Sequence, residues 1–399
     1  MDLHDGLTTL LVMTAVAAVA PFVAAMLARF RLPQVVVFIV GGVLIGPEVL
    51  GWAQPDAITL LANVGLGFLF LLAGYELDLE LFREHVGRRA IVAWFVTAGL
   101  ATAVTGVLSA VGFVRAFVPV AIGLTTTAFG ALLPILRDNG MLGGAFGRFI
   151  LPAGAVGEFL PIVAIAVFLS AKGEFLGLLT LVLMFAVAGL LALLPRWTTR
   201  PKFVTISREG ENATSQTTLR LTVALLFALL VVADRFGLDI VLGAFLAGII
   251  LRRWAPGDVH SLESKLDAIG YGFFIPVFFI TSGMNLDIAS IAEAPQRLLV
   301  FFLLLVAVRG LPALVLYRRD LVLRERLQMV LLTATALPLL VALSEIGLST
   351  GNMLPENAAA LVGAGVLSVM VLPSVAVALN RKAPRAAPRT PAAVTDRAD

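Results

Sequence analysis

Long apolar stretches, separated by short polar intervals, run along almost the whole chain. About 20 mainly apolar residues are enough for a helix to cross a bilayer, and most of the stretches approach or exceed this length. We assign thirteen spans, at 7–28, 34–50, 56–79, 90–111, 116–136, 143–170, 174–195, 219–234, 238–251, 268–286, 296–317, 327–346 and 356–379. The pattern predicts an all-α polytopic membrane protein whose transmembrane domain covers residues 1–380.

Composition supports the same class, because 59% of residues are hydrophobic and only 14% are charged, against about 25% charged in soluble proteins. The basic residues fix an orientation. With the N-terminus outside, 24 of the 29 Lys and Arg residues fall in one set of loops and 4 in the other. Such a bias marks the cytoplasmic side. We therefore expect an inner-membrane protein with a cytoplasmic C-terminus, and we attribute the high pI to topology rather than to nucleic-acid binding.

Two polar segments remain outside the spans. The interval from Arg196 to Thr218 is predicted to be a cytoplasmic linker, and the basic tail at 381–399 is predicted to be disordered because Ala, Pro and Arg cannot build a core. No soluble regulatory domain is expected after the tail.

Short matches at a nearly constant offset relate the two halves of the chain. The matched residues are Gly42 with Gly248, Gly74 with Gly283, Asp78 with Asp287, Thr125 with Thr333 and Thr127 with Thr335. Seven spans separate the copies, so the copies run in opposite directions. Spans 1–6 and 8–13 are thus predicted to be inverted repeats, an arrangement found in many secondary transporters.

Glu158 lies near the middle of the span at 143–170, with Pro152 and Pro161 on either side. A charge at the bilayer centre costs about 2.5–3.5 kcal/mol on insertion scales, so an acid at this depth indicates an ion pathway by default. The alternative is a buried glutamate that only ties helices together.

Arg309 is the other charge deep inside a span, at a similar depth in 296–317. A buried acid and a buried base at one depth predict an interaction in which Arg309 balances the charge of Glu158. Burial favours the protonated acid and the arginine opposes this, so the carboxylate is suited to exchanging a proton for a cation. A static salt bridge is the alternative.

Two threonine-rich segments occupy matching places in the two halves, and their residues are Thr125, Thr126, Thr127, Thr333 and Thr335. Interrupted helices at corresponding positions are a pointer to a transporter's binding site. We expect the helices to be broken there, with Thr126, Thr127 and unwound carbonyls available to a cation. Intact helices with back-bonded hydroxyls are the alternative.

Other chemistries find no support in the sequence. Cysteine is absent, and the three histidines are scattered over predicted loops. No cofactor, no transition-metal site and no enzymatic activity are therefore expected. The chain also has no phosphate-binding loop of the GxxxxGK[ST] type, which argues against ATP-driven pumping.

Five motifs stand out along the chain, and they read FLFLLAGYELD, GLTTTAFGALLPILRDNG, GAVGEFLPIVAIAV, LGAFLAGIILR and YGFFIPVFFITSGMNLD. Together they resemble the second monovalent cation:proton antiporter family, or Kef-type sodium/hydrogen exchanger domain. The resemblance covers roughly residues 7–380. It implies a homodimer, and it implies that the two broken helices cross at the site. It also implies a mobile core over about 90–170 and 296–379, a dimerisation region over about 7–79 and 219–286, and a linker span at 174–195.

The chain departs from the family pattern in two ways. Gly157 precedes Glu158 where the family commonly has a second polar residue, so only one carboxylate is available. The nucleotide-binding domain of Kef-type potassium systems is also missing, which gives no support to nucleotide gating.

These observations lead to one principal hypothesis about function. We expect exchange of sodium or potassium for protons, with alternating access around Glu158. Because a single carboxylate would carry both ions in turn, the exchange is expected to be electroneutral. A sodium-coupled symporter of organic anions, of the bile-acid type, is the alternative, and there Arg309 would bind the anion. A membrane sensor without transport is disfavoured by the two midplane charges.

Overall fold

The computed structural model describes residues 3–26, 34–77, 79–169, 174–193, 216–254, 259–293, 295–351 and 353–381, which contain helices and no strand. The first half consists of α1 (Leu3–Met26), α2 (Gln34–Ile45), η2 (Pro55–Ile58), α3 (Thr59–Glu76), η3 (Leu79–Phe82), α4 (His85–Ala110), α5 (Phe117–Gly123), α6 (Phe129–Asp138), α7 (Gly144–Phe168) and α8 (Glu174–Leu193). The second half consists of α11 (Thr217–Phe236), α12 (Ile240–Trp254), α13 (Val259–Ile269), η4 (Gly270–Phe274), α14 (Ile275–Met284), α15 (Ile288–Glu293), α16 (Pro295–Leu304), η5 (Leu305–Gly310), α17 (Pro312–Leu316), α18 (Leu323–Thr333), α19 (Pro338–Ser349) and α20 (Pro355–Arg381).

Within the described residues, nine helical segments are long and apolar enough to cross a membrane. Two further apolar helices, at 34–45 and 178–192, are shorter. Every predicted span overlaps a helix or a pair of helices, but length and composition support nine crossings, so the count of thirteen stays a prediction. The difference of four arises because the predicted span at 116–136 is divided into α5 and α6, and because α2, α12 and the apolar segment of α8 at 178–192 are short.

Three predictions fall on residues that are not described. Asp78 lies outside the described residues, as do all but the first residue of the tail at 381–399 and most of the linker from Arg196 to Thr218.

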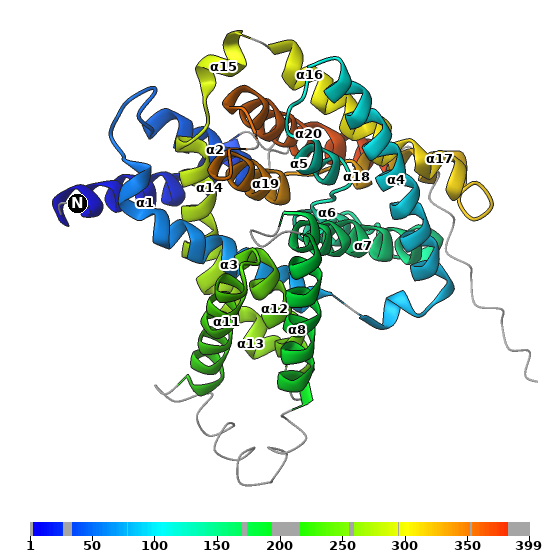
Figure 1. Cartoon of the computed structure of the whole chain (residues 1–399), viewed down its shortest axis with the longest axis horizontal. Coiled ribbons are helices and arrows are strands. Elements are labelled where there is room, and N and C mark those ends of the chain that lie inside the picture. Colours follow the sequence, from blue (N-terminus) through cyan, green and yellow to red (C-terminus); the bar gives the residue numbers. More distant parts are fainter. Residues whose placement is uncertain are drawn as a thin grey trace, which may run out of the picture.

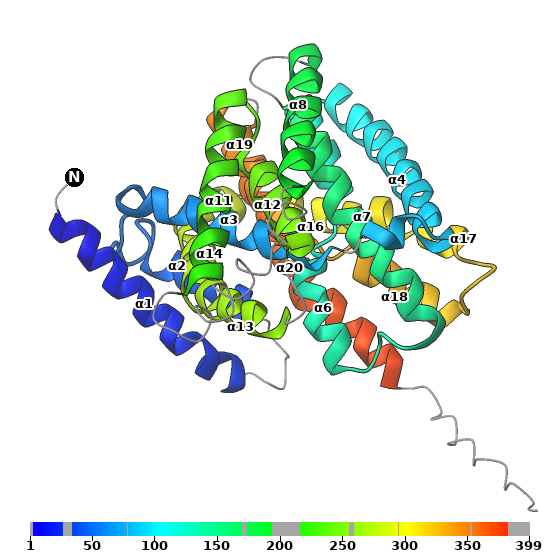
Figure 2. The same ribbon diagram turned by 90° about the horizontal axis from the view of Figure 1, so that it is seen from below.

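The helices pack in two groups. In the first, α3 packs against α12 and α14, while α2 packs against α1 and α14 and α11 packs against α12. In the second, α20 packs against α16, α18 and α19, and α7 packs against α4, α5 and α18. Helix α8 contacts both α7 and α12 and so connects the groups. Figure 1 shows the two groups side by side, and Figure 2 shows α1 and α4 at opposite ends of the molecule.

Two helix crossings in the first group depend on glycine. At the crossing of α2 with α14, a Cβ atom at Gly42 would collide with the carbonyl of Ile280, and one at Gly283 would collide with the carbonyl of Ile39. At the crossing of α3 with α12, a Cβ at Gly74 would meet Phe245. A Cβ at Gly248 would meet the carbonyl of Leu71. Small residues allow backbones to approach this closely in membranes, and these four glycines are the ones that the sequence matches between the halves.

Two helices contain a π-helical turn, and each turn is followed by proline. The η4 turn (Gly270–Phe274) lies just before Pro276, and the η5 turn (Leu305–Gly310) lies just before Pro312. Proline has no N–H and its ring displaces the carbonyl four residues earlier, so the preceding turn widens. Such π-bulges occur often at functional sites, and η5 carries Arg309.

The glycine crossings give a first prediction. In Gly283→Ala, the new methyl group overlaps the Ile39 carbonyl and the Cα of Gly42. Overpacking of this kind costs about 1–3 kcal/mol, so we expect a lower midpoint of thermal unfolding in detergent. Gly99→Ala is the control, since nothing lies within 4 Å of a Cβ there and alanine favours the helix. Equal midpoints for the two variants would contradict the crossing geometry.

Candidate ion-binding site

Two helices are interrupted where the threonines cluster. The chain is not helical between α5 and α6, at 124–128, nor between α18 and α19, at 334–337. At the first break, the hydroxyls of Thr125 and Thr126 donate to the carbonyls of Ile122 and Gly123, at 2.7 and 2.9 Å. These bonds take up carbonyls at the end of α5. At the second, Pro338 begins α19, which is the position where a missing N–H costs least.

The two interrupted segments touch each other. The Thr127 hydroxyl donates to the carbonyl of Thr333 at 2.7 Å, and the Ala128 N–H donates to the carbonyl of Thr335 at 2.7 Å. Unwound backbone therefore finds hydrogen-bond partners across the crossing. This is a requirement inside a membrane protein, where water does not supply them.

Helix α7 supplies a third partner to the same segment. The carbonyl of Gly157 would normally accept from the N–H four residues later, but residue 161 is proline and has none. The Thr127 N–H donates to this free carbonyl at 2.9 Å. Gly157 also has no room for a side chain, since a Cβ atom would collide with the guanidinium of Arg309 and the hydroxyl of Thr127.

Glu158 follows directly and is only 7% exposed. Its Oε2 accepts a hydrogen bond of 3.3 Å from the N–H of Gly130, in the first turn of α6 (Phe129–Asp138). Free N–H groups and the helix dipole at such an end stabilise a negative charge. Burial works in the other direction and favours the neutral acid. The carboxylate is therefore held between two opposing effects.

Arg309 is 5% exposed and bonds to the same region from η5. Its Nε donates to the Thr127 hydroxyl at 3.0 Å, and its Nη2 donates to the carbonyl of Ala153 at 3.1 Å. The expected pairing with Glu158 is not present in this structure. The two deep charges instead bond separately, because the guanidinium donates to Thr127 and Ala153 and the carboxylate accepts from Gly130.

The remaining candidate residues lie in or beside the breaks and are buried. The hydroxyls of Thr333 and Thr335 donate to the carbonyls of Met329 and Leu331 in their own helix. Each threonine oxygen still has a lone pair, which a cation or another donor can use. Within the described residues, no group of three His, Cys, Asp or Glu side chains suits a metal ion.

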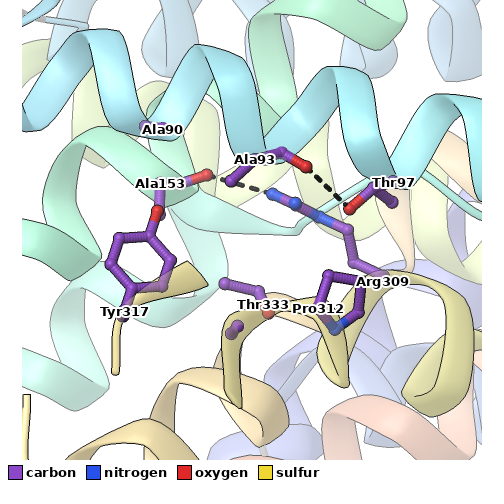
Figure 3. A pocket seen from close by; sticks show the side chains of 9 residues that line it. Ala90, Ala93, Thr97, Ala153, Arg309, Pro312, Tyr317 and Thr333 are labelled. Carbon is purple, nitrogen blue, oxygen red and sulfur yellow. Dashed lines mark hydrogen bonds between the residues drawn. The ribbon is translucent and has the colours of Figure 1, made fainter. Parts of the chain in front are cut away.

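Sequence reasoning missed Ser368 in α20. Its hydroxyl bonds to both the N–H and the carbonyl of Ala336, at 3.0 and 2.9 Å, and thereby holds the second break. A serine in an apolar span was the available signal. Tyr317 was also missed. With Arg309 it lines a small cavity between α4, α7, η5 and α18, together with Ala90, Ala93, Thr97, Ala153, Pro312, Ala313 and Thr333 (Figure 3).

Comparison with known proteins gives consistent similarities. Residues 14–381 match the family described as "Sodium/hydrogen exchanger, transmembrane". A putative Na⁺/H⁺ antiporter of Bacillus subtilis, YjbQ, is 29% identical over 325 residues, which are 76% of this chain and 51% of that protein. The probable Na⁺/H⁺ antiporter 3 of Methanocaldococcus jannaschii is 25% identical, over 71% of this chain and 73% of that protein. The chain thus spans about half of the first relative.

A solved structure is similar in fold. The sodium proton antiporter MjNhaP1 from Methanocaldococcus jannaschii, at pH 8, superposes with a TM-score of 0.62 at 16% identity. The similarity covers 93% of this chain and 97% of that one. At this identity the likeness concerns the fold alone.

The role of Thr127 at the crossing gives a second prediction. Thr127→Val removes the acceptor of Arg309 and the donor to Thr333 at nearly constant volume. Leaving a buried polar group without a partner costs about 1–3 kcal/mol, so we expect a clear drop in the thermal midpoint. Thr127→Ser keeps the hydroxyl and should lose much less. If serine and valine destabilise equally, the hydroxyl's hydrogen bonds do not hold the crossing.

Proposed function

Because the chain belongs to the sodium/hydrogen exchanger transmembrane family, we propose that it exchanges a monovalent cation, sodium or potassium, for protons by secondary active transport. This family consists of membrane transporters rather than enzymes. The observation that carries the proposal is the buried carboxylate of Glu158, bonded to the first turn of α6 beside two crossed helix breaks. Relatives named as Na⁺/H⁺ antiporters favour this function over an organic-anion symporter.

In the proposed cycle, Glu158 binds a proton and a cation in turn. The hydroxyl oxygens of Thr126 and Thr127, with carbonyls of the unwound segment, complete the cation's coordination. Arg309 balances the charge of Glu158 without forming an ion pair with it, because its hydrogen bonds go to Thr127 and Ala153. A cation therefore has no salt bridge to displace. Breaking a buried salt bridge leaves an uncompensated charge and is costly.

Alternating access requires two parts that move against each other. We propose that the helices of about 90–170 and 296–379 form the moving core, and that those of about 7–79 and 219–286 form the dimerisation region of a homodimer, with 174–195 as the link. The two packing groups support this division, and α8 contacts both of them.

We also propose that the halves are inverted repeats and that the chain crosses the membrane thirteen times. The two glycine crossings support the repeat. Gly42 contacts Gly283, and Gly74 contacts Gly248, so each crossing pairs one matched residue from each half. The strong bias of basic residues to one set of loops supports an outside N-terminus and a cytoplasmic C-terminus in the inner membrane.

Glu158→Gln tests the carrier role directly. Glutamine keeps the shape but cannot ionise, so we expect cation-driven proton flux in proteoliposomes to fall to the level of protein-free vesicles. Sodium, potassium and lithium gradients should be compared with a pH-sensitive dye. Glu84→Gln is the matched control, because Glu84 is exposed just before α4. Wild-type flux in Glu158→Gln would remove Glu158 from the mechanism.

The presence of a single titrating carboxylate leads to a further prediction, about the net charge moved in each transport cycle. Gly157 contributes no second proton, and arginine stays protonated in the working range, so one proton should exchange for one monovalent cation. The cycle is then electroneutral. A membrane potential acts on net charge with about 2.3 kcal/mol per 100 mV. In vesicles clamped at different potentials, with sodium as the driving ion, the equilibrium point of exchange should not move. A shift with potential would require a second titrating group.

A further inference from the structure

Arg309 is a buried cation without a carboxylate partner. Two of its three guanidinium nitrogens donate to neutral oxygens, those of Thr127 and Ala153. Arg89 provides a contrast, because it forms an ion pair with Asp320 although both side chains are partly exposed. An isolated charge in an apolar interior is costly unless a counter-charge accompanies it. Of these two arginines, the more buried one, Arg309, is therefore the one without a direct contact to a negative charge.

A cavity adjoins this guanidinium (Figure 3). It leaves about 10 Å³ for the centre of a water-sized sphere, which is room for about one particle of roughly that size. Three alanines, Ala90, Ala93 and Ala313, make part of its wall apolar. No acidic side chain is among the lining residues, and Glu158 is not one of them.

Two side chains that line this space, those of Arg309 and Tyr317, can donate a hydrogen bond to an occupant, whereas the hydroxyl oxygens of the two lining threonines can only accept one. Tyr317 is 2% exposed, and its hydroxyl has no hydrogen-bond partner among the described residues. The two threonines of the lining have already used their hydrogens, since Thr97 donates to Ala93 and Thr333 to Met329. A phenol and a guanidinium therefore remain to donate to whatever occupies the cavity. A buried hydroxyl without a partner costs about 1–3 kcal/mol.

We propose that this cavity binds a monovalent halide ion, with chloride as its ordinary occupant, held by the guanidinium of Arg309 and the hydroxyl of Tyr317. A water molecule would satisfy the hydroxyl but would leave the arginine's charge without a counter-ion. A chloride ion accepts from both groups and neutralises the charge. The site does not include Glu158, but it shares Arg309 with the exchange cycle proposed above, so it is tested without a transport measurement.

The first test measures stability and needs no transport. Purified wild-type protein is unfolded thermally in sodium chloride and in sodium gluconate at equal ionic strength. We expect a midpoint higher by roughly 2 °C in chloride, as for a ligand that binds only the folded state. Tyr317→Phe should abolish this difference. Tyr75→Phe is the matched control, because the Tyr75 hydroxyl is also buried without a partner but does not line the cavity.

The second test locates the ion. Wild-type crystals grown in bromide should give an anomalous peak between the Arg309 guanidinium and the Tyr317 hydroxyl, and this result stands even if Tyr317→Phe does not fold. An absent peak, with water at the position, overturns the proposal. It is also overturned if chloride does not stabilise the wild type, or if it stabilises Tyr317→Phe as much as Tyr75→Phe.

Discussion

The N–H of Thr127 can bond to the carbonyl of Gly157 because Pro161 leaves that carbonyl without its partner in α7. The rest of the site is assembled around this bond. The hydroxyl of the same threonine connects to α18 through the Thr333 carbonyl and to η5 through Arg309. One unwound residue thus joins three helices, and the break between α5 and α6 is stabilised by the elements that it crosses rather than by solvent.

In this arrangement two opposite charges, Glu158 and Arg309, bond to residues in or beside the same helix break but not to each other. Glu158 bonds to the end of α6, whereas Arg309 bonds to Thr127 and Ala153. A direct ion pair would satisfy both groups at once and would compete with any incoming ion. Separate hydrogen bonds leave the carboxylate with unused lone pairs, and they hold the arginine through neutral partners.

Much of the fold can be read from the sequence because hydropathy and proline act locally. The helices follow the apolar stretches, and the breaks fall at the threonine clusters, beside Pro338 in the second. The pairing of Glu158 with Arg309 was wrong for this structure because equal depth along two helices does not determine which way side chains point. Arg309 lies in the π-helical turn before Pro312, and no periodicity reveals such a turn.

Other parts of the site depend on contacts between distant segments, which a single sequence does not contain. Ser368 bonds to Ala336 across a sequence separation of 32 residues. The residues next to Ser368 in the sequence do not indicate this contact. The number of crossings is also hard to read, because short helices such as α2 (Gln34–Ile45) do not meet the length of a full span on their own.

The closeness of Gly157 to Arg309 limits how such a protein can change over evolution. A second acid at position 157 would supply another proton per cycle, but its Cβ would occupy the space of the guanidinium and of the Thr127 hydroxyl. That single substitution therefore arrives with a steric conflict. Under the proposed one-carboxylate mechanism, a change to two carboxylates would therefore require Arg309 to be lost or reoriented first.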